Sequence, residues 1–170
     1  MAISLHTFVT MYRRDLDALA HLLRKGAAFA AEHGVADAEM LGWRLAEDMN
    51  PLSFQVAVVV NFASGWAARA ADKAVPDAVI GAEHDVAGLM GAIAAARAGL
   101  EALTEADLAG RDDAPISFTI MEGMAPTLPA GQWLSGFATT NIHFHLSIAY
   151  AILRMKGVPL GKVDLFPGGL

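Results

Sequence analysis

The chain has 170 residues, of which 55% are hydrophobic and 18% are charged, and it contains no cysteine. These values describe one globular domain with a sizeable core. They exclude a disordered chain, a disulfide framework, a thiolate nucleophile and a thiolate metal site. Lysine and arginine number 12 against 18 aspartates and glutamates, which gives a net charge of −6. That sign argues against a nucleic-acid partner, because such a partner requires a basic face.

The chain is apolar on average, so a membrane partner has to be considered. The most apolar stretch runs from Val56 to Ala71 and is shorter than the ~20 residues that span a bilayer. It is also interrupted by Asn61, Ser64 and Arg69. The N-terminal residues show no secretory signal. We therefore expect a cytoplasmic protein with no membrane partner, and the high apolar content of a small chain leads us to expect a homodimer.

Two long helices are predicted in the first half of the chain. Between Ser4 and His33, apolar residues recur every three or four positions, which is typical of one helical face. A short helical stretch covers Val35 to Met49. The second long helix covers Pro51 to Asp72 and is apolar nearly all round, so we expect it to be the most buried. The valine run at Val58–Val60 also suits a strand, but the length of the segment favours a helix.

A third helix is predicted from about Glu83 to Leu103, with its apolar residues at helical spacing. It contains Gly88, Gly91 and Gly99, which weaken a helix but can permit close approach by another helix. The charged stretch that follows is expected to contain turns.

A β-hairpin is predicted between the third and fourth long helices. Residues Ile116 to Leu128 alternate between apolar and polar side chains around a turn at Glu122-Gly123. The fourth helix covers about Ala130 to Met155. The chain is therefore predicted to be a single mainly helical domain over residues 1–170, with a short hairpin before the last long helix.

The fourth helix carries the polar groups most able to perform chemistry. At ~100° per residue, Asn141 and His145 lie ~40° apart on one face, whereas His143 and His145 point ~200° apart. His145 shares its face with Trp133 and Phe137, so we expect it to point inward. His143 is expected to face outward or toward a partner subunit.

The second long helix adds Gln55 and Asn61 to the candidate site. An amide at Asn61, inside the run VVVNFA, must find hydrogen bonds. Together with Asn141 and His145 these residues form a candidate inward-facing pocket, with Trp133 as a wall. His145 is the candidate catalytic residue, because an imidazole can act as a general acid or base near neutral pH. The alternative is a core histidine bonded to a backbone carbonyl or a buried water.

Two segments resemble an uncharacterised bacterial family of DinB-like proteins. They are D-M-x-P-L-x-x-Q-V at Asp48–Val56 and A-Y-x-I-L-R-x-x-G-V-x-x-G-K-x-D at Ala149–Asp164. That family is a domain of unknown function in the DinB/YfiT-like superfamily. The resemblance implies an all-α, DinB-like antiparallel four-helix bundle, in a superfamily whose members are often dimeric.

Many members of that superfamily hold a metal with three histidines, and some are thiol-dependent transferases or isomerases that use bacillithiol or mycothiol. One histidine comes from the second helix and two from an H-x-x-x-H pair on the last long helix. The resemblance places Asn61, Asn141 and His145 at these positions, so two of the three expected histidines are replaced.

Two functions remain open on the sequence. The first is a binding or structural module whose polar pocket replaces the metal site and takes a small molecule, with no cofactor. The second is an enzyme that uses a divalent metal, zinc or nickel, or His145 alone. We favour the first, because the sequence shows neither a nucleophile nor a complete ligand set.

Overall fold

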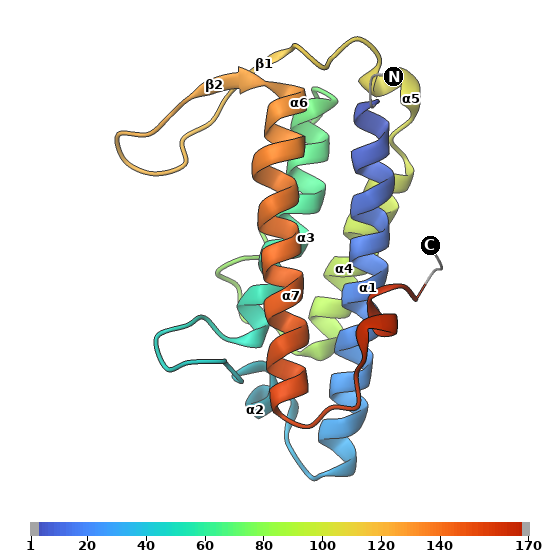
Figure 1. The fold of residues 1–170 in the computed structure, drawn as a ribbon, viewed down its shortest axis with the longest axis vertical. Helices are drawn as coiled ribbons and strands as arrows, with labels where there is room; N and C mark the ends of the chain where they lie inside the picture. Colours follow the sequence, from blue (N-terminus) through green and yellow to red (C-terminus); the bar gives the residue numbers. More distant parts are fainter. Residues whose placement is uncertain (1–3, 168–170) are drawn as a thin grey trace.

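The computed structural model describes residues 4–167 and shows four long helices side by side, with a small hairpin projecting from one end (Figure 1). In chain order the elements are α1 Leu5–Glu32, α2 Asp37–Leu41, α3 Leu52–Ala70, α4 Val86–Glu101, α5 Glu105–Leu108, β1 Pro115–Ser117, β2 Thr127–Pro129, α6 Ala130–Gln132, the π-helical segment η1 Trp133–Ala138, α7 Thr139–Met155 and the 3-10 helix η2 Lys162–Leu165. No helix within this part of the chain has the length and apolarity to cross a membrane.

The long helices run in two directions. Figure 1 shows α1 and α7 running one way and α3 and α4 the other. Because α3 and α4 are parallel, the loop of residues 71–85 has to return along their length. The most extensive packing joins α3 to α7 and α1 to α4.

Side-chain caps explain where the helices begin and end. Ser4 accepts a hydrogen bond from the backbone N–H of His6 at the start of α1, and Asp85 accepts one from Gly88 at the start of α4. α1 is followed by Gly34, which has a φ of +69°. A glycine adopts this left-handed conformation without strain, so the chain can turn away from the helix there.

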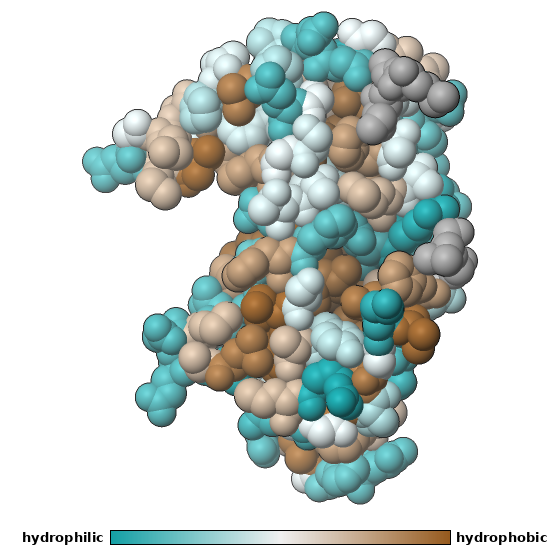
Figure 2. Space-filling model, in the orientation of Figure 1, coloured by the Kyte–Doolittle hydropathy of each residue, from teal (hydrophilic) through white to brown (hydrophobic). Residues whose placement is uncertain are grey.

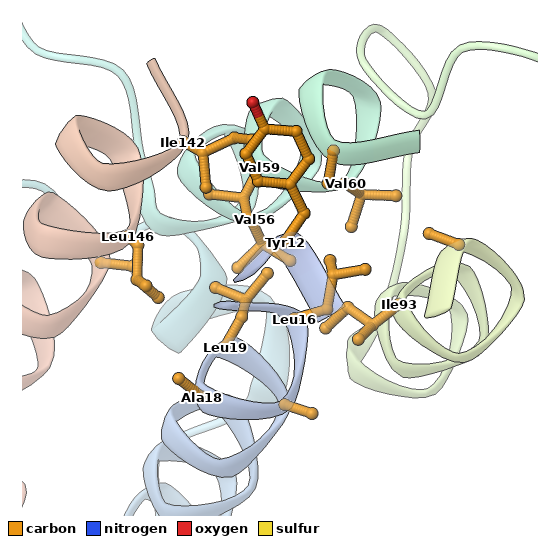
Figure 3. Close-up of a cluster of buried hydrophobic side chains, with 14 of the residues drawn as sticks. Tyr12, Leu16, Ala18, Leu19, Val56, Val59, Val60, Ile93, Ile142 and Leu146 are labelled. Atoms are coloured by element: carbon orange, nitrogen blue, oxygen red, sulfur yellow. The ribbon is translucent and has the colours of Figure 1, made fainter. Parts of the chain in front are cut away.

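α3 lies at the centre of the core, as its sequence predicted, since most of its side chains are buried. Figure 3 shows Val56, Val59 and Val60 of α3 facing side chains from all three other long helices. Tyr12 is completely buried in this cluster, and its hydroxyl donates to Leu134 O at 2.9 Å. Burial raises the pKa of Tyr12, so it is a neutral hydrogen-bond donor that fixes α1 against the last long helix.

The last long helix changes its winding along its length. The π-helical turn at η1 lies between α6 and α7, where an unbroken α-helix was expected. Two side chains of α7 donate hydrogen bonds to backbone carbonyls of this segment. Thr139 Oγ1 donates to Leu134 O at 2.7 Å, and Asn141 Nδ2 donates to Phe137 O at 2.8 Å. Apolar periodicity does not reveal a single wide turn, because the turn shifts the pattern by only one position.

The hairpin is confirmed and is shorter than expected. Ile116 pairs with Leu128 in an antiparallel register, and Gly123 occupies the turn with a φ of +76°. The charged stretch before the hairpin contains turns, as expected, and also the short helix α5, which begins with a capping box between Thr104 and Asp107.

The glycines of α4 do not serve close helix packing. A Cβ added at Gly91 or Gly99 would meet nothing within 4 Å, so these glycines face open space. The closest contacts of a Cβ at Gly88 would be with the adjacent cap residues His84 and Asp85. The third helix therefore packs through its larger side chains, including Leu89 and Ile93.

The C-terminal segment is fastened to α1 through one carboxylate. Asp164, on η2, accepts hydrogen bonds from His21 at 2.8 Å, Lys25 at 3.0 Å and the backbone of Gly161 at 2.6 Å. Its side chain is only 12% exposed. The Gly161 N–H first, and then the His21 and Lys25 side chains, hold the pKa of Asp164 well below its ordinary value.

We predict that Asp164→Asn lowers the free energy of unfolding by about 1–2 kcal/mol at pH 7, because it removes charge-assisted hydrogen bonds. A depressed carboxylate pKa stabilises the fold above the unfolded value of 3.8, and this contribution is lost as the pH falls below it. Urea unfolding at pH 7 and pH 3 checks both points. The exposed Asp113→Asn is the control, and an equal loss for both variants at pH 7 would contradict the assigned role.

Candidate functional site

His145 and Gln55 form a hydrogen-bonded pair between α7 and α3. The Nδ1 atom of His145 lies 2.7 Å from Oε1 of Gln55. Gln55 is 3% exposed, and its own Nε2 donates to Asn50 O at 2.9 Å. Since Nε2 of Gln55 is engaged there, Oε1 is the atom that faces the imidazole. An acceptor at that place requires the proton of His145 to be on Nδ1.

This pairing determines what His145 can do. With its proton on Nδ1, Nε2 presents a lone pair that can accept a proton or bind a cation. Burial lowers the pKa of His145 below its ordinary value of 6.5, so the ring is neutral at pH 7. Phe54 and Phe144 lie edge-on to it, with ring centroids 6.0 and 5.1 Å away. His145 is therefore a neutral base beside two aromatic rings.

The other predicted site residues have separate partners. Oδ1 of Asn61 accepts from Val79 N at 2.8 Å, so this amide holds the α3–α4 loop. Asn141 bonds to Phe137 O within its own helix. The indole of Trp133 is 1% exposed and donates to Ile116 O, which connects the last helix to the hairpin. Of the predicted residues, only Gln55 and His145 are joined by a direct hydrogen bond.

These side chains do not fit the three-histidine metal centre that the family resemblance implies. His145 supplies the one imidazole, while Asn61 and Asn141 use their amides elsewhere, and amides are poor zinc ligands. Within residues 4–167, no three histidine, aspartate or glutamate side chains lie close enough to hold a metal.

His143 points to the other side of α7, as helical geometry predicted. Its Nε2 lies 3.3 Å from Oδ2 of Asp15 on α1. The contact with this carboxylate raises the pKa of His143. His143 and His145, although two positions apart, thus contact different helices and have opposite pKa shifts.

A hollow of about 180 Å³ opens beside Asn61. We name it the Asn61 hollow; its walls include Asn61, Phe62, Trp66, Arg69, Ile80 and Phe118. α3 forms one wall, the loop that follows α3 forms a second, and the hairpin residue Phe118 forms a third. Figure 2 shows that the molecular surface is recessed on the side from which the hairpin projects.

An aromatic cluster backs the Asn61 hollow. Trp66 stacks on Trp133 with ring centroids 4.7 Å apart, and Phe118 meets Trp66 edge-on at 5.0 Å. Phe62 contacts Phe137 at 5.6 Å. The predicted pocket wall Trp133 thus lies behind Trp66 and supports it.

Arg69 also lines the hollow, although its sequence position marked it only as an interruption of an apolar stretch. Its guanidinium lies 5.3 Å from the Trp66 ring centroid and 5.1 Å from that of Phe118. Burial lowers its pKa, but an arginine remains charged at neutral pH. One signal was available, because Arg69 is the single charged residue of α3 and lies three positions after Trp66.

Two larger hollows offer less specific chemistry. One of about 270 Å³ between α3 and α4 has walls made mainly of aliphatic side chains, and its Lys73 is already paired with Asp107 at 2.7 Å. The other, of about 800 Å³, is a broad open cleft beside His84, whose ring bonds to Val79 O. The Asn61 hollow combines aromatic walls with polar groups, which is typical of small-molecule sites.

The four long helices and the short hairpin define a DinB-like protein. The chain is similar to a crystal structure described as that of a DinB family member protein from Shewanella denitrificans. The two are 30% identical, with a TM-score of 0.86, and the match covers 95% of this chain and 91% of that one.

The family described as a domain of unknown function, DUF1993, matches residues 5–166, and the chain belongs to this family. The resemblance seen in the sequence is therefore confirmed. No curated protein matches the chain.

We predict that the two neighbouring histidines titrate on opposite sides of 6.5, His143 above and His145 below. The raised pKa of His143 stabilises the fold below pH 6.5 and this contribution is lost as the pH rises through the folded value. The lowered pKa of His145 has the opposite effect. The contribution of His145 to stability is present above pH 6.5 and is lost as the pH falls through the folded value, because protonating the buried ring costs free energy. NMR titration of the imidazole Cε1 protons measures both.

Matched variants separate the causes of these shifts. Asp15→Asn should lower the pKa of His143 and leave His145 unchanged. Gln55→Glu should raise the pKa of His145, because a carboxylate beside Nδ1 favours the imidazolium. Unchanged titration of His145 in Gln55→Glu would show that the two side chains are not paired.

Proposed function

We propose that this protein is a DinB-like four-helix bundle of one domain that binds a small molecule in the Asn61 hollow without a three-histidine metal centre. The observation that carries the proposal is the hollow itself. It lies at the second-helix position where the superfamily resemblance places a metal ligand, and it is bounded by aromatic rings and by the polar side chains Asn61 and Arg69.

The size of the hollow limits the ligand. A closed apolar cavity of about 150 Å³ holds one benzene molecule. The Asn61 hollow, at about 180 Å³, is of comparable size. We therefore propose a ligand whose apolar part is a single ring or a body of similar volume. Such a ring would contact Phe62, Trp66 and Phe118.

We predict that a single-ring compound binds in the hollow and that Ala78→Phe abolishes binding by filling its mouth. Ala78 is an exposed loop residue of the hollow wall, so the substitution should not disturb the core. The probes are benzoate, benzamide and benzylamine, and the readout is the NMR resonance of the Trp66 indole N–H during titration.

Ala125→Phe, at an exposed position of the hairpin, is the control and should bind like the parent protein. The proposal is contradicted if none of the three compounds shifts the Trp66 resonance at millimolar concentration, or if Ala78→Phe leaves binding unchanged.

A second candidate function is an enzyme that uses His145. The observation that favours it is the Gln55–His145 hydrogen bond, which leaves Nε2 as an acceptor on a neutral ring. Such a ring can act as a general base without a metal. The same histidine could instead serve a metal-dependent enzyme. Stoichiometric zinc or nickel in protein purified without a chelator or a nickel column, lost in His145→Ala, would support that form of this function against the first.

We also propose that the protein is a cytoplasmic homodimer. Phe144 and Met155 are 54% and 52% exposed on α7 and lie three turns apart on one face. Exposed apolar side chains in a row are typical of a surface that a second copy covers. A monomer mass by light scattering at micromolar concentration would contradict the dimer.

A further inference from the structure

Arg69 carries a charge that the fold does not neutralise. Its guanidinium forms neither an ion pair nor a hydrogen bond with another residue between 4 and 167, and no acidic side chain of that part of the chain lies within ion-pair distance of it. Asp77, the one acidic residue in the wall of the same hollow, is exposed on the loop. A half-buried guanidinium without a partner retains unused hydrogen-bond donors.

The Arg69 guanidinium does not bond to the carbonyls at the C-terminal end of α3. A basic residue in the last turn of a helix usually stabilises the final carbonyls. Here the side chain folds back by one turn, since a Cβ added at Gly65 would lie 2.9 Å from Nη1 of Arg69. It is held there against Trp66 and Phe118. Contact with the rings does not use the N–H donors of the guanidinium in hydrogen bonds, and these donors lie in the plane of the group.

The remaining polar groups of the Asn61 hollow also favour an acceptor ligand. Oδ1 of Asn61 is occupied by Val79 N, which leaves its Nδ2 as a donor. Ser64 donates its hydroxyl to Val60 O. The groups available to a ligand are therefore the donors of Arg69 and Asn61 and, on the exposed loop, the carboxylate of Asp77. A planar fork of guanidinium donors matches the two oxygens of a carboxylate.

We propose that the Asn61 hollow binds a small aromatic monocarboxylate, of which benzoate is the simplest, with the carboxylate on Arg69 and the ring among Phe62, Trp66 and Phe118. This inference rests on the proposed function and names the chemical class of its ligand. Charge selects the anion, and the volume of the hollow restricts the body to about one ring. Asp77 opposes the anion from the rim and so sets an upper limit on affinity.

The test compares benzoate with the neutral benzamide, which has the same shape. In NMR titrations of the parent protein, benzoate should bind about tenfold more tightly than benzamide, as expected for one charge-assisted interaction. Arg69→Gln should remove this preference, so that benzoate binds no more tightly than benzamide. Asp77→Asn should tighten benzoate alone. Arg24→Gln, an exposed arginine on α1, is the matched control and should change neither.

A further variant keeps the charge and moves the guanidinium. Gly65→Ala places a methyl carbon 2.9 Å from Nη1, which is too close, so the end of the Arg69 side chain must shift and benzoate should bind more weakly. If Arg69→Gln does not fold, Gly65→Ala still tests whether the Arg69 guanidinium binds the carboxylate.

Equal affinities for benzoate and benzamide in the parent protein, both lost in Ala78→Phe, overturn the carboxylate assignment and leave the proposed function standing. Preferential binding of benzylamine, also lost in Ala78→Phe, does the same. Failure of all three compounds to bind overturns the proposed function and this inference together.

Discussion

The packing of α3 against the last long helix, formed by η1 and α7, is the interaction on which the rest of the structure depends. Three contacts follow one another along the antiparallel pair: Trp66 on Trp133, Phe62 on Phe137 and Gln55 on His145. Aromatic pairs of this kind contribute ~0.5–1.5 kcal/mol each beyond the area they bury. Because α3 carries a single charge and is buried on most sides, each of its amide side chains must find a specific partner. That requirement positions the loop through Asn61 and the histidine through Gln55.

The need of each buried amide for a partner also separates Gln55 from Asn61, which the sequence placed in one pocket. Successive positions along α3 point in different directions, so Gln55 reaches α7 whereas Asn61 reaches the backbone of Val79 in the loop. The loop has to return along α3 because α4 runs parallel to it. An amide at Asn61 that fastens this loop therefore also forms a wall of the hollow beneath it. In this chain a position that the resemblance associates with a metal ligand instead holds a loop in place.

Local signals predicted most of the fold. Ser4 and Gly34 delimit α1 through capping and left-handed geometry, and the opposite directions of His143 and His145 follow from the regular winding of α7. Contacts between distant segments could not be predicted in this way. The pairing of Gln55 with His145 depends on the register between two helices 90 positions apart. The π-helical turn at η1 leaves almost no trace in apolar periodicity, and the freedom of Arg69 depends on which carboxylates the loop brings near it.

We propose that α3, the loop and the hairpin hold the Arg69 guanidinium against aromatic rings, unpaired and ready for an anion. A crystal structure of the protein grown with benzoate would examine this arrangement. We expect both carboxylate oxygens within hydrogen-bond distance of Arg69, with the guanidinium still about 5 Å from the ring centres of Trp66 and Phe118. Arg69 paired with Asp77, and no benzoate in the hollow, would contradict it.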